Sequence, residues 1–144
     1  MRRCFLVFLL LASFLPLPSC CRETPRAAVL LSEYLGERGA YPAGVTYSTD
    51  PSEGEVLSEE LIASLYARAD GFCEYGACVE EAAVYLSSRL DTRFEMAVFL
   101  CYGSADTKAV SEMCLRRAAL LGRFGEVEVE VECRGRAVYY RLTG

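Results

Sequence analysis

Cysteine is the residue type in this chain with the most chemical options. The 144 residues include eight cysteines and no histidine. Cys20 directly follows Leu17-Pro18-Ser19 at the end of an apolar leader. Small residues before a cysteine at this place are typical of bacterial export signals that end in a lipid-attachment cysteine. The sequence therefore predicts acylation of Cys20 by fatty acids such as palmitate.

The leader itself, residues 1–19, has the layout of a signal peptide. Arg2 and Arg3 come before an apolar run from Cys4 to Leu15, in which Ser13 is the one polar residue. A membrane-spanning helix needs about 20 apolar residues, and this run is shorter and is followed closely by two prolines. A removed signal peptide is therefore favoured over a permanent transmembrane helix. Ser19 also fits ordinary signal-peptidase cleavage, which would release the protein instead of anchoring it.

Six cysteines remain after Cys20, an even number that suits a disulfide framework in an exported protein. Cys73 and Cys78 are the best pair, because the loop between them contains Gly76 and can turn back to disulfide distance. Cys101 and Cys114 lie in apolar stretches, where a cysteine is often a small core residue. With a single C-x₄-C spacing and no histidine, the sequence predicts neither a zinc site nor a cofactor.

The charge of the chain argues against nucleic acid as a partner. Once residues 1–19 are removed, 13 of the 15 basic residues remain against 20 acidic ones, a net charge of −7. Nucleic acids and anionic lipids both favour clustered Lys and Arg. We therefore expect attachment to the membrane through the lipid anchor and not through a basic patch.

No arrangement of side chains in the sequence indicates catalysis. Without histidine, neither a Ser-His-Asp nor a Cys-His arrangement can form. Ser104 and Lys108 are four residues apart, but they suit a helix cap and a solvated first turn better than a nucleophile and its base. No glycine-rich phosphate loop follows a strand. The sequence thus predicts no enzymatic activity, with a hydrolase as a distant alternative.

Apolar periodicity predicts helices and pairs of strands along the chain. A helix between Arg22 and Gly39 is followed by a turn-rich stretch, residues 36–54, which we expect to be a tether or wrapping loop. Arg117 falls in the apolar stripe of a later helix, where its stem can lie on apolar surface while its charge reaches water. A buried salt bridge is the alternative for Arg117. The other predicted elements are a helix at 58–66, strands at 79–88 and 94–102, and a helix at 104–123.

The clearest pattern is a hairpin near residue 135. Glutamate and valine alternate from Glu126 to Cys133, and Arg134-Gly135 fits a two-residue turn. This turn places Glu128 opposite Arg141. The row of four glutamates suits either a cation or a basic partner, or it is a solvated strand face. We favour the solvated face, because hard-cation sites usually draw convergent ligands from loops.

Together the elements predict an α+β fold, an antiparallel sheet with helices packed on one face, in the order α-β-β-α-β-β after the signal peptide. We divide the chain into residues 1–19 as signal peptide, 20–54 as lipid-attachment cysteine, short helix and turn-rich loop, and 55–144 as the α+β domain. The 125 residues that remain without the leader are enough for one domain with a sizeable core.

Four short motifs stand out between residues 30 and 142. They are Tyr41-Pro-Ala-Gly-Val-Thr-Tyr47, Leu57-Ser-Glu-Glu-Leu61, the Glu95–Phe99 strand followed by Asp106, and Gly135-Arg-Ala-Val-Tyr139. The chain thereby resembles short lipoproteins of Gram-positive bacteria that share the domain of unknown function 4358. This resemblance implies a small exported α+β domain and supplies no catalytic residue. The several cysteines after Cys20 depart from the pattern.

These inferences predict an exported, membrane-anchored lipoprotein of the cell envelope with a non-enzymatic binding or accessory role. Its partner would be an envelope protein or ligand that the sequence does not identify. The loop aromatics Tyr41, Tyr47, Phe72 and Tyr75 are candidate contact residues, since aromatic side chains are enriched at interfaces. Alternatively, each of them covers the core. A secreted, disulfide-stabilised interaction domain is the competing interpretation.

Overall fold

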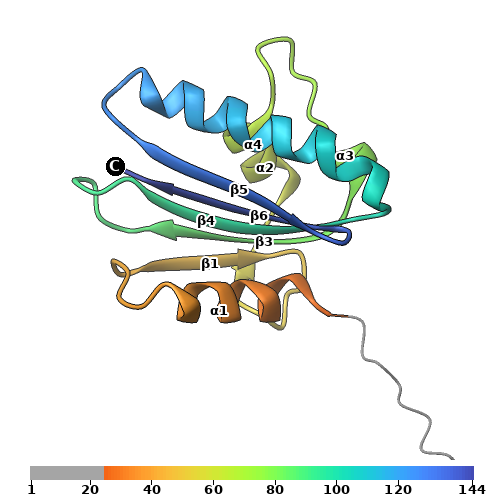
Figure 1. Cartoon of the computed structure of the whole chain (residues 1–144), viewed down its shortest axis with the longest axis horizontal. Helices are drawn as coiled ribbons and strands as arrows, with labels where there is room; N and C mark the ends of the chain where they lie inside the picture. Colours follow the sequence, from red (N-terminus) through yellow and green to blue (C-terminus); the bar gives the residue numbers. More distant parts are fainter. Residues whose placement is uncertain (1–24) are drawn as a thin grey trace, which may run out of the picture.

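A six-stranded sheet forms the centre of the computed structural model, which describes residues 25–144 (Figure 1). The strand order across the sheet is β2-β1-β3-β4-β6-β5. The predicted signal peptide and Cys20 lie outside the described residues. Within residues 25–144, no helix is long and apolar enough to cross a membrane. The elements are α1 (Ala27–Glu37), β1 (Gly44–Ser48), β2 (Glu55–Val56), α2 (Glu59–Tyr66), α3 (Tyr75–Cys78), β3 (Val79–Ser87), β4 (Phe94–Cys101), a 3-10 turn (Ser104–Asp106), α4 (Thr107–Gly122), β5 (Glu128–Arg134) and β6 (Ala137–Thr143).

The predicted α+β class with a mainly antiparallel sheet is confirmed. Every strand pair is antiparallel except β1 with β2, which is parallel. β4 is central, as its apolar pattern predicts, and seven of its eight residues are buried. Residues 59–143 follow the predicted order apart from the short α3, but β1 and β2 come before them. The order of the whole chain therefore differs from the predicted one.

Helices cover both faces of the sheet, and not one face as we expected. α2, α3 and α4 lie on one face, and α1 lies on the other (Figure 1). The reason is visible in β4, where the adjacent residues Val98 and Phe99 point to opposite sides and belong to different hydrophobic cores. A sheet that is apolar on both sides must be covered on both sides.

A carboxylate on β3 fixes the start of α1. The Oε1 atom of Glu81 accepts a hydrogen bond from the Ala27 backbone N–H at 2.9 Å. This bond satisfies one of the free N–H groups at the helix N-terminus, where a negative charge is also favourable. Arg26 forms an ion pair with Asp50 and lies 3.9 Å from Glu81. The cap of α1 is thus a tertiary contact and not a local one.

Residues 44–48, which we expected within a loop, form the interior strand β1. It lies between β2 and β3, and Ser48 on it is fully buried. At Gly44 a side chain would overlap the backbone carbonyl of Leu86 on β3, so only glycine fits there. The strand is short and flanked by turn residues, which hides it in the sequence. Through β1 and α1, residues 25–56 share the sheet and the cores with the rest of the described chain.

The hairpin forms, but its turn is one residue later than predicted. Arg134 pairs with Ala137, so Gly135 and Arg136 make the two-residue turn. Gly135 has a φ of +61°, which glycine adopts without strain at the first turn position of a type II′ hairpin. Arg141 consequently lies opposite Glu130 instead of Glu128. The shift changes the partners by two residues, and each side chain stays on its predicted face.

Candidate functional sites

A buried polar cluster joins β4, α2 and α4. Glu95 is only 3% exposed. Its Oε1 atom accepts a hydrogen bond from the Tyr66 hydroxyl at 2.7 Å. Its Oε2 atom accepts bonds from Nε and Nη2 of Arg117 at 3.2 and 3.1 Å. The cluster ties two helices to one strand through a single carboxylate.

We expected Arg117 to extend its charge into water, but it does not. It forms the buried salt bridge that the sequence left as the alternative, because Glu95 lies within reach on the sheet beneath α4. Burial raises the pKa of Tyr66 well above its usual range, and the Glu95 carboxylate raises it further. Tyr66 hence stays protonated and remains a hydrogen-bond donor. Burial likewise raises the pKa of Tyr140, whose hydroxyl has no hydrogen-bond partner among the described residues.

A shallow recess of about 230 Å³ lies beside this cluster. Glu95, Arg117 and Arg93 contribute to its wall. The Nη1 and Nη2 atoms of Arg93 donate to the carbonyls of Leu121 and Phe124 at the end of α4, at 3.4 and 2.5 Å. Guanidinium groups suit carboxylate and phosphate groups. Here, however, both groups already have partners, since Arg117 is paired with Glu95 and Arg93 donates to two carbonyls.

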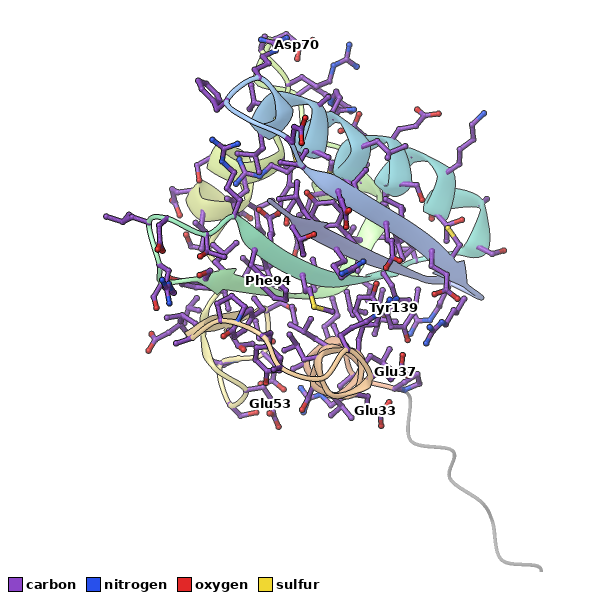
Figure 2. All side chains as sticks on the ribbon, turned by 60° about the vertical axis from the view of Figure 1, so that its left-hand side comes forward. Glu33, Glu37, Glu53, Asp70, Phe94 and Tyr139 are labelled. Carbon is purple, nitrogen blue, oxygen red and sulfur yellow. The ribbon has the colours of Figure 1, made fainter. Side chains whose placement is uncertain are left out.

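A second recess, of about 340 Å³, lies between α1 and β1. Its volume falls within the range of about 300–1,000 Å³ that is usual for small-molecule sites. Tyr41 and Tyr85 line it, and their ring centroids are 5.3 Å apart in an edge-to-face arrangement. Glu53 adds a carboxylate from the loop before β2. Figure 2 shows Glu53 next to α1, which is seen end-on there, with Phe94 above it on the sheet.

The four aromatic residues predicted as contacts do not form one surface. Tyr41, 43% exposed, lies on the α1 side and stacks against Phe94. Phe72, 52% exposed, lies in the connection between α2 and α3. Tyr47 and Tyr75 are partly buried and pack against the core under α4. Only Tyr41 thus combines an exposed ring with a recess.

The predicted disulfide residues, Cys73 and Cys78, are both partly buried free thiols in the structure. Cys73 Sγ lies 3.9 Å from the Met113 sulfur. Burial raises the pKa of both thiols. The bridge between them stays a prediction.

The other described cysteines are also free. Cys101 and Cys114 are fully buried, which confirms their predicted place in the core. Cys133 is exposed, and its Sγ atom lies 3.4 Å from the Ser111 hydroxyl on α4. Among residues 25–144, no three His, Cys, Asp or Glu side chains are grouped so that they could hold a metal ion.

Ser104 and Lys108 are both exposed, and no hydrogen bond joins their side chains. The turn before α4 is held by Asp106, whose Oδ2 atom accepts a hydrogen bond from the Gly103 N–H at 3.1 Å. The Ser104 backbone carbonyl accepts a hydrogen bond from the Thr107 hydroxyl at 2.8 Å. The geometry therefore gives this pair no shared chemical role.

The glutamate row of β5 is partly neutralised by arginines from three elements. Glu130 lies 3.0 Å from both Arg141 on β6 and Arg38 at the end of α1. Arg141 and Arg38 lower the pKa of Glu130, the hydrogen bond from Arg141 most strongly. Glu132 pairs with Arg134 at 2.9 Å. No sequence pattern indicated Arg38, because only the packing of α1 brings it to the hairpin.

The fold and these recesses define a small α+β domain. Comparisons add no relative to this description. The chain significantly matches no family model, no curated protein and no solved structure. The resemblance to lipoproteins with the domain of unknown function 4358 therefore stays a prediction from its motifs.

Proposed function

We propose that the protein is an exported lipoprotein with a non-enzymatic binding or accessory role in the cell envelope. The observation that carries the proposal is the apolar leader that ends at Cys20, seven residues before Ala27 opens α1. Seven residues span at most about 25 Å. An acyl anchor on Cys20 thus holds the start of α1 close to the membrane surface, and two acyl chains are enough for stable attachment.

Two features of the described residues support binding as the role. The recess beside α1 presents the exposed ring of Tyr41, and the recess at the end of α4 presents Arg93. The partner in this proposal is an envelope protein or a ligand and not a nucleic acid, because the chain without its leader is acidic. A secreted interaction domain stabilised by a Cys73–Cys78 bridge is the second candidate.

The test is metabolic labelling with an alkyne fatty acid, followed by fractionation of cells and medium. Wild type should carry the label in the membrane fraction, and Cys20→Ser should lose it. Cys21→Ser is the matched control, since it removes the adjacent thiol and should keep the label. Equal labelling of Cys20→Ser and wild type, or release of both into the medium, contradicts the lipid anchor and favours the secreted alternative.

A further inference from the structure

β5 is an edge strand that is open along its outer side. It ends the strand order of the sheet, and six of its seven residues are exposed. Arg134 and Ala137 close the two-residue turn and form a hydrogen-bonded pair, so every second residue from Arg134 back to Glu128 faces β6. The intervening residues, Val129, Val131 and Cys133, turn their N–H and C=O groups outward. No backbone group elsewhere in residues 25–144 bonds to them.

On the α4 side of this edge, Leu115 and Val129 form an apolar surface, which we call the apolar shelf. Ser111 contacts Cys133, and a Cβ atom on Gly122 would lie 3.5 Å from Val127. Residues 111, 115, 118 and 122 share one side of a helix. Leu115 must therefore stand over the middle of β5. Leu115 is 48% exposed and Val129 39%, so a strand added next to β5 would bury both.

On the opposite side of the sheet the same edge borders a recess of about 400 Å³. Tyr34, Arg38, and residues 129–132 line it. The recess exists because α1 packs on β3 and β4 and leaves the face of β5 uncovered. Figure 2 shows Glu33 and Glu37 on α1 below Tyr139 of β6. Glu37 lies 3.7 Å from Arg134, so one carboxylate of α1 lies near the end of β5.

The α1 side of the edge has an excess of negative charge. Glu128, Glu130 and Glu132 alternate along β5, and Glu37 on α1 lies 3.7 Å from Arg134 of the same strand. The guanidinium groups that pair with these carboxylates are fewer, namely those of Arg38, Arg134 and Arg141. An incoming strand places alternate side chains on this acidic side and on the apolar shelf.

We propose that the outer edge of β5 binds an extended segment of a partner protein by β-strand addition. The segment alternates apolar residues, which lie against Leu115 and Val129, with Lys or Arg, which lie on the glutamate side. The proposal rests on the binding role proposed above, but not on the lipid anchor. A second copy of this chain fits poorly, because antiparallel pairing of two β5 strands centred on Val131 sets Glu130 opposite Glu132.

Fluorescence anisotropy with labelled nine-residue peptides tests the proposal on the full chain in detergent micelles. A peptide of alternating lysine and valine should bind at least tenfold tighter than one of alternating glutamate and valine, and salt should reduce the difference. Two further lysine–valine peptides carry N-methyl groups, either on every lysine or on every valine. One of the two should lose binding at least tenfold and the other should keep it, because only one edge of the peptide faces β5.

Val131→Pro is the variant for the protein side. It removes an outward N–H group without removing a β5–β6 hydrogen bond, a position where edge strands accept proline. We expect at least a tenfold loss of peptide binding, whereas Val131→Thr, which keeps the N–H, should bind like wild type. Circular dichroism checks that both variants are folded, and the N-methyl peptides decide the question if Val131→Pro is not.

Equal binding of the basic and acidic peptides, or of both N-methylated peptides, overturns the proposal. If wild type binds no peptide but forms concentration-dependent dimers, and Val131→Pro abolishes these dimers, then the edge binds a second copy of this chain. If wild type binds neither peptide while Cys20 is still labelled, the edge proposal fails and the lipoprotein proposal stands.

Discussion

Replacing Arg117 by methionine should destabilise the protein more than any exposed arginine can. Methionine keeps an apolar stem against the core but removes both hydrogen bonds to Glu95, which is 3% exposed. Leaving a buried charge without its partner costs about 3–5 kcal/mol. With a urea dependence of about 2 kcal/mol per molar, the unfolding midpoint should fall by about 2 M. Urea unfolding followed by circular dichroism at pH 7 measures this shift.

The same helix offers a matched control. Arg116 pairs with Glu74, but its side chain is 37% exposed, so Arg116→Met should cost about 1 kcal/mol or less. Adding Glu95→Gln to Arg117→Met removes the unpaired charge and keeps an acceptor for Tyr66. This double variant should recover about 2 kcal/mol of the loss. The reasoning is refuted if Arg117→Met costs no more than Arg116→Met, or if the second substitution adds to the loss.

Three further outcomes can be measured. Cys73 and Cys78 should be bridged in exported protein, so intact mass after alkylation should change only with prior reduction; quantitative alkylation without reduction would reject the bridge. Gly135→Ala should lower the free energy of unfolding in urea by about 1 kcal/mol, because alanine is strained at a φ of +61°. Gly76→Ala is the control, since Gly76 lies in α3 without a positive φ and its replacement should be near neutral. Equal effects of the two substitutions would contradict the turn assignment. Burial raises the pKa of the Cys101 thiol to about 11. Because the folded-state pKa lies above the unfolded one, the contribution of Cys101 to the free energy of unfolding should be constant below about pH 8.5 and be lost toward pH 11. The free energy of unfolding should therefore fall less steeply over this range in Cys101→Ala, and an identical fall in that variant would exclude the thiol as a cause.

Local patterns account for the parts of the fold that the sequence predicted correctly. β4 was expected to be central because both of its faces are apolar, and α2 was expected to begin at Ser58, whose hydroxyl accepts a hydrogen bond from the Leu61 N–H at 3.2 Å. The alternation in β5 predicted a hairpin and which side chains share a face. Each of these depends on residues that are close in sequence, where periodicity and capping act directly.

The candidate sites depend on contacts between distant residues, and the sequence determined less of them. Arg117 stood in an apolar stripe, but only the packing of α4 on the sheet brings it to Glu95, 22 residues earlier. Arg38 likewise meets Glu130 only because α1 covers the second face of the sheet. The position of the turn depends on the positive φ of Gly135. In the sequence, a turn at Arg134-Gly135 and a turn at Gly135-Arg136 both contain this glycine, so the pattern did not distinguish them. The sequence by itself thus determined the longer elements from α2 to β6 and the faces of their side chains, since these follow local periodicity, but it did not reveal β1. The tertiary structure alone decided which charges meet and which edge stays open, because both depend on how the helices divide between the two faces of the sheet.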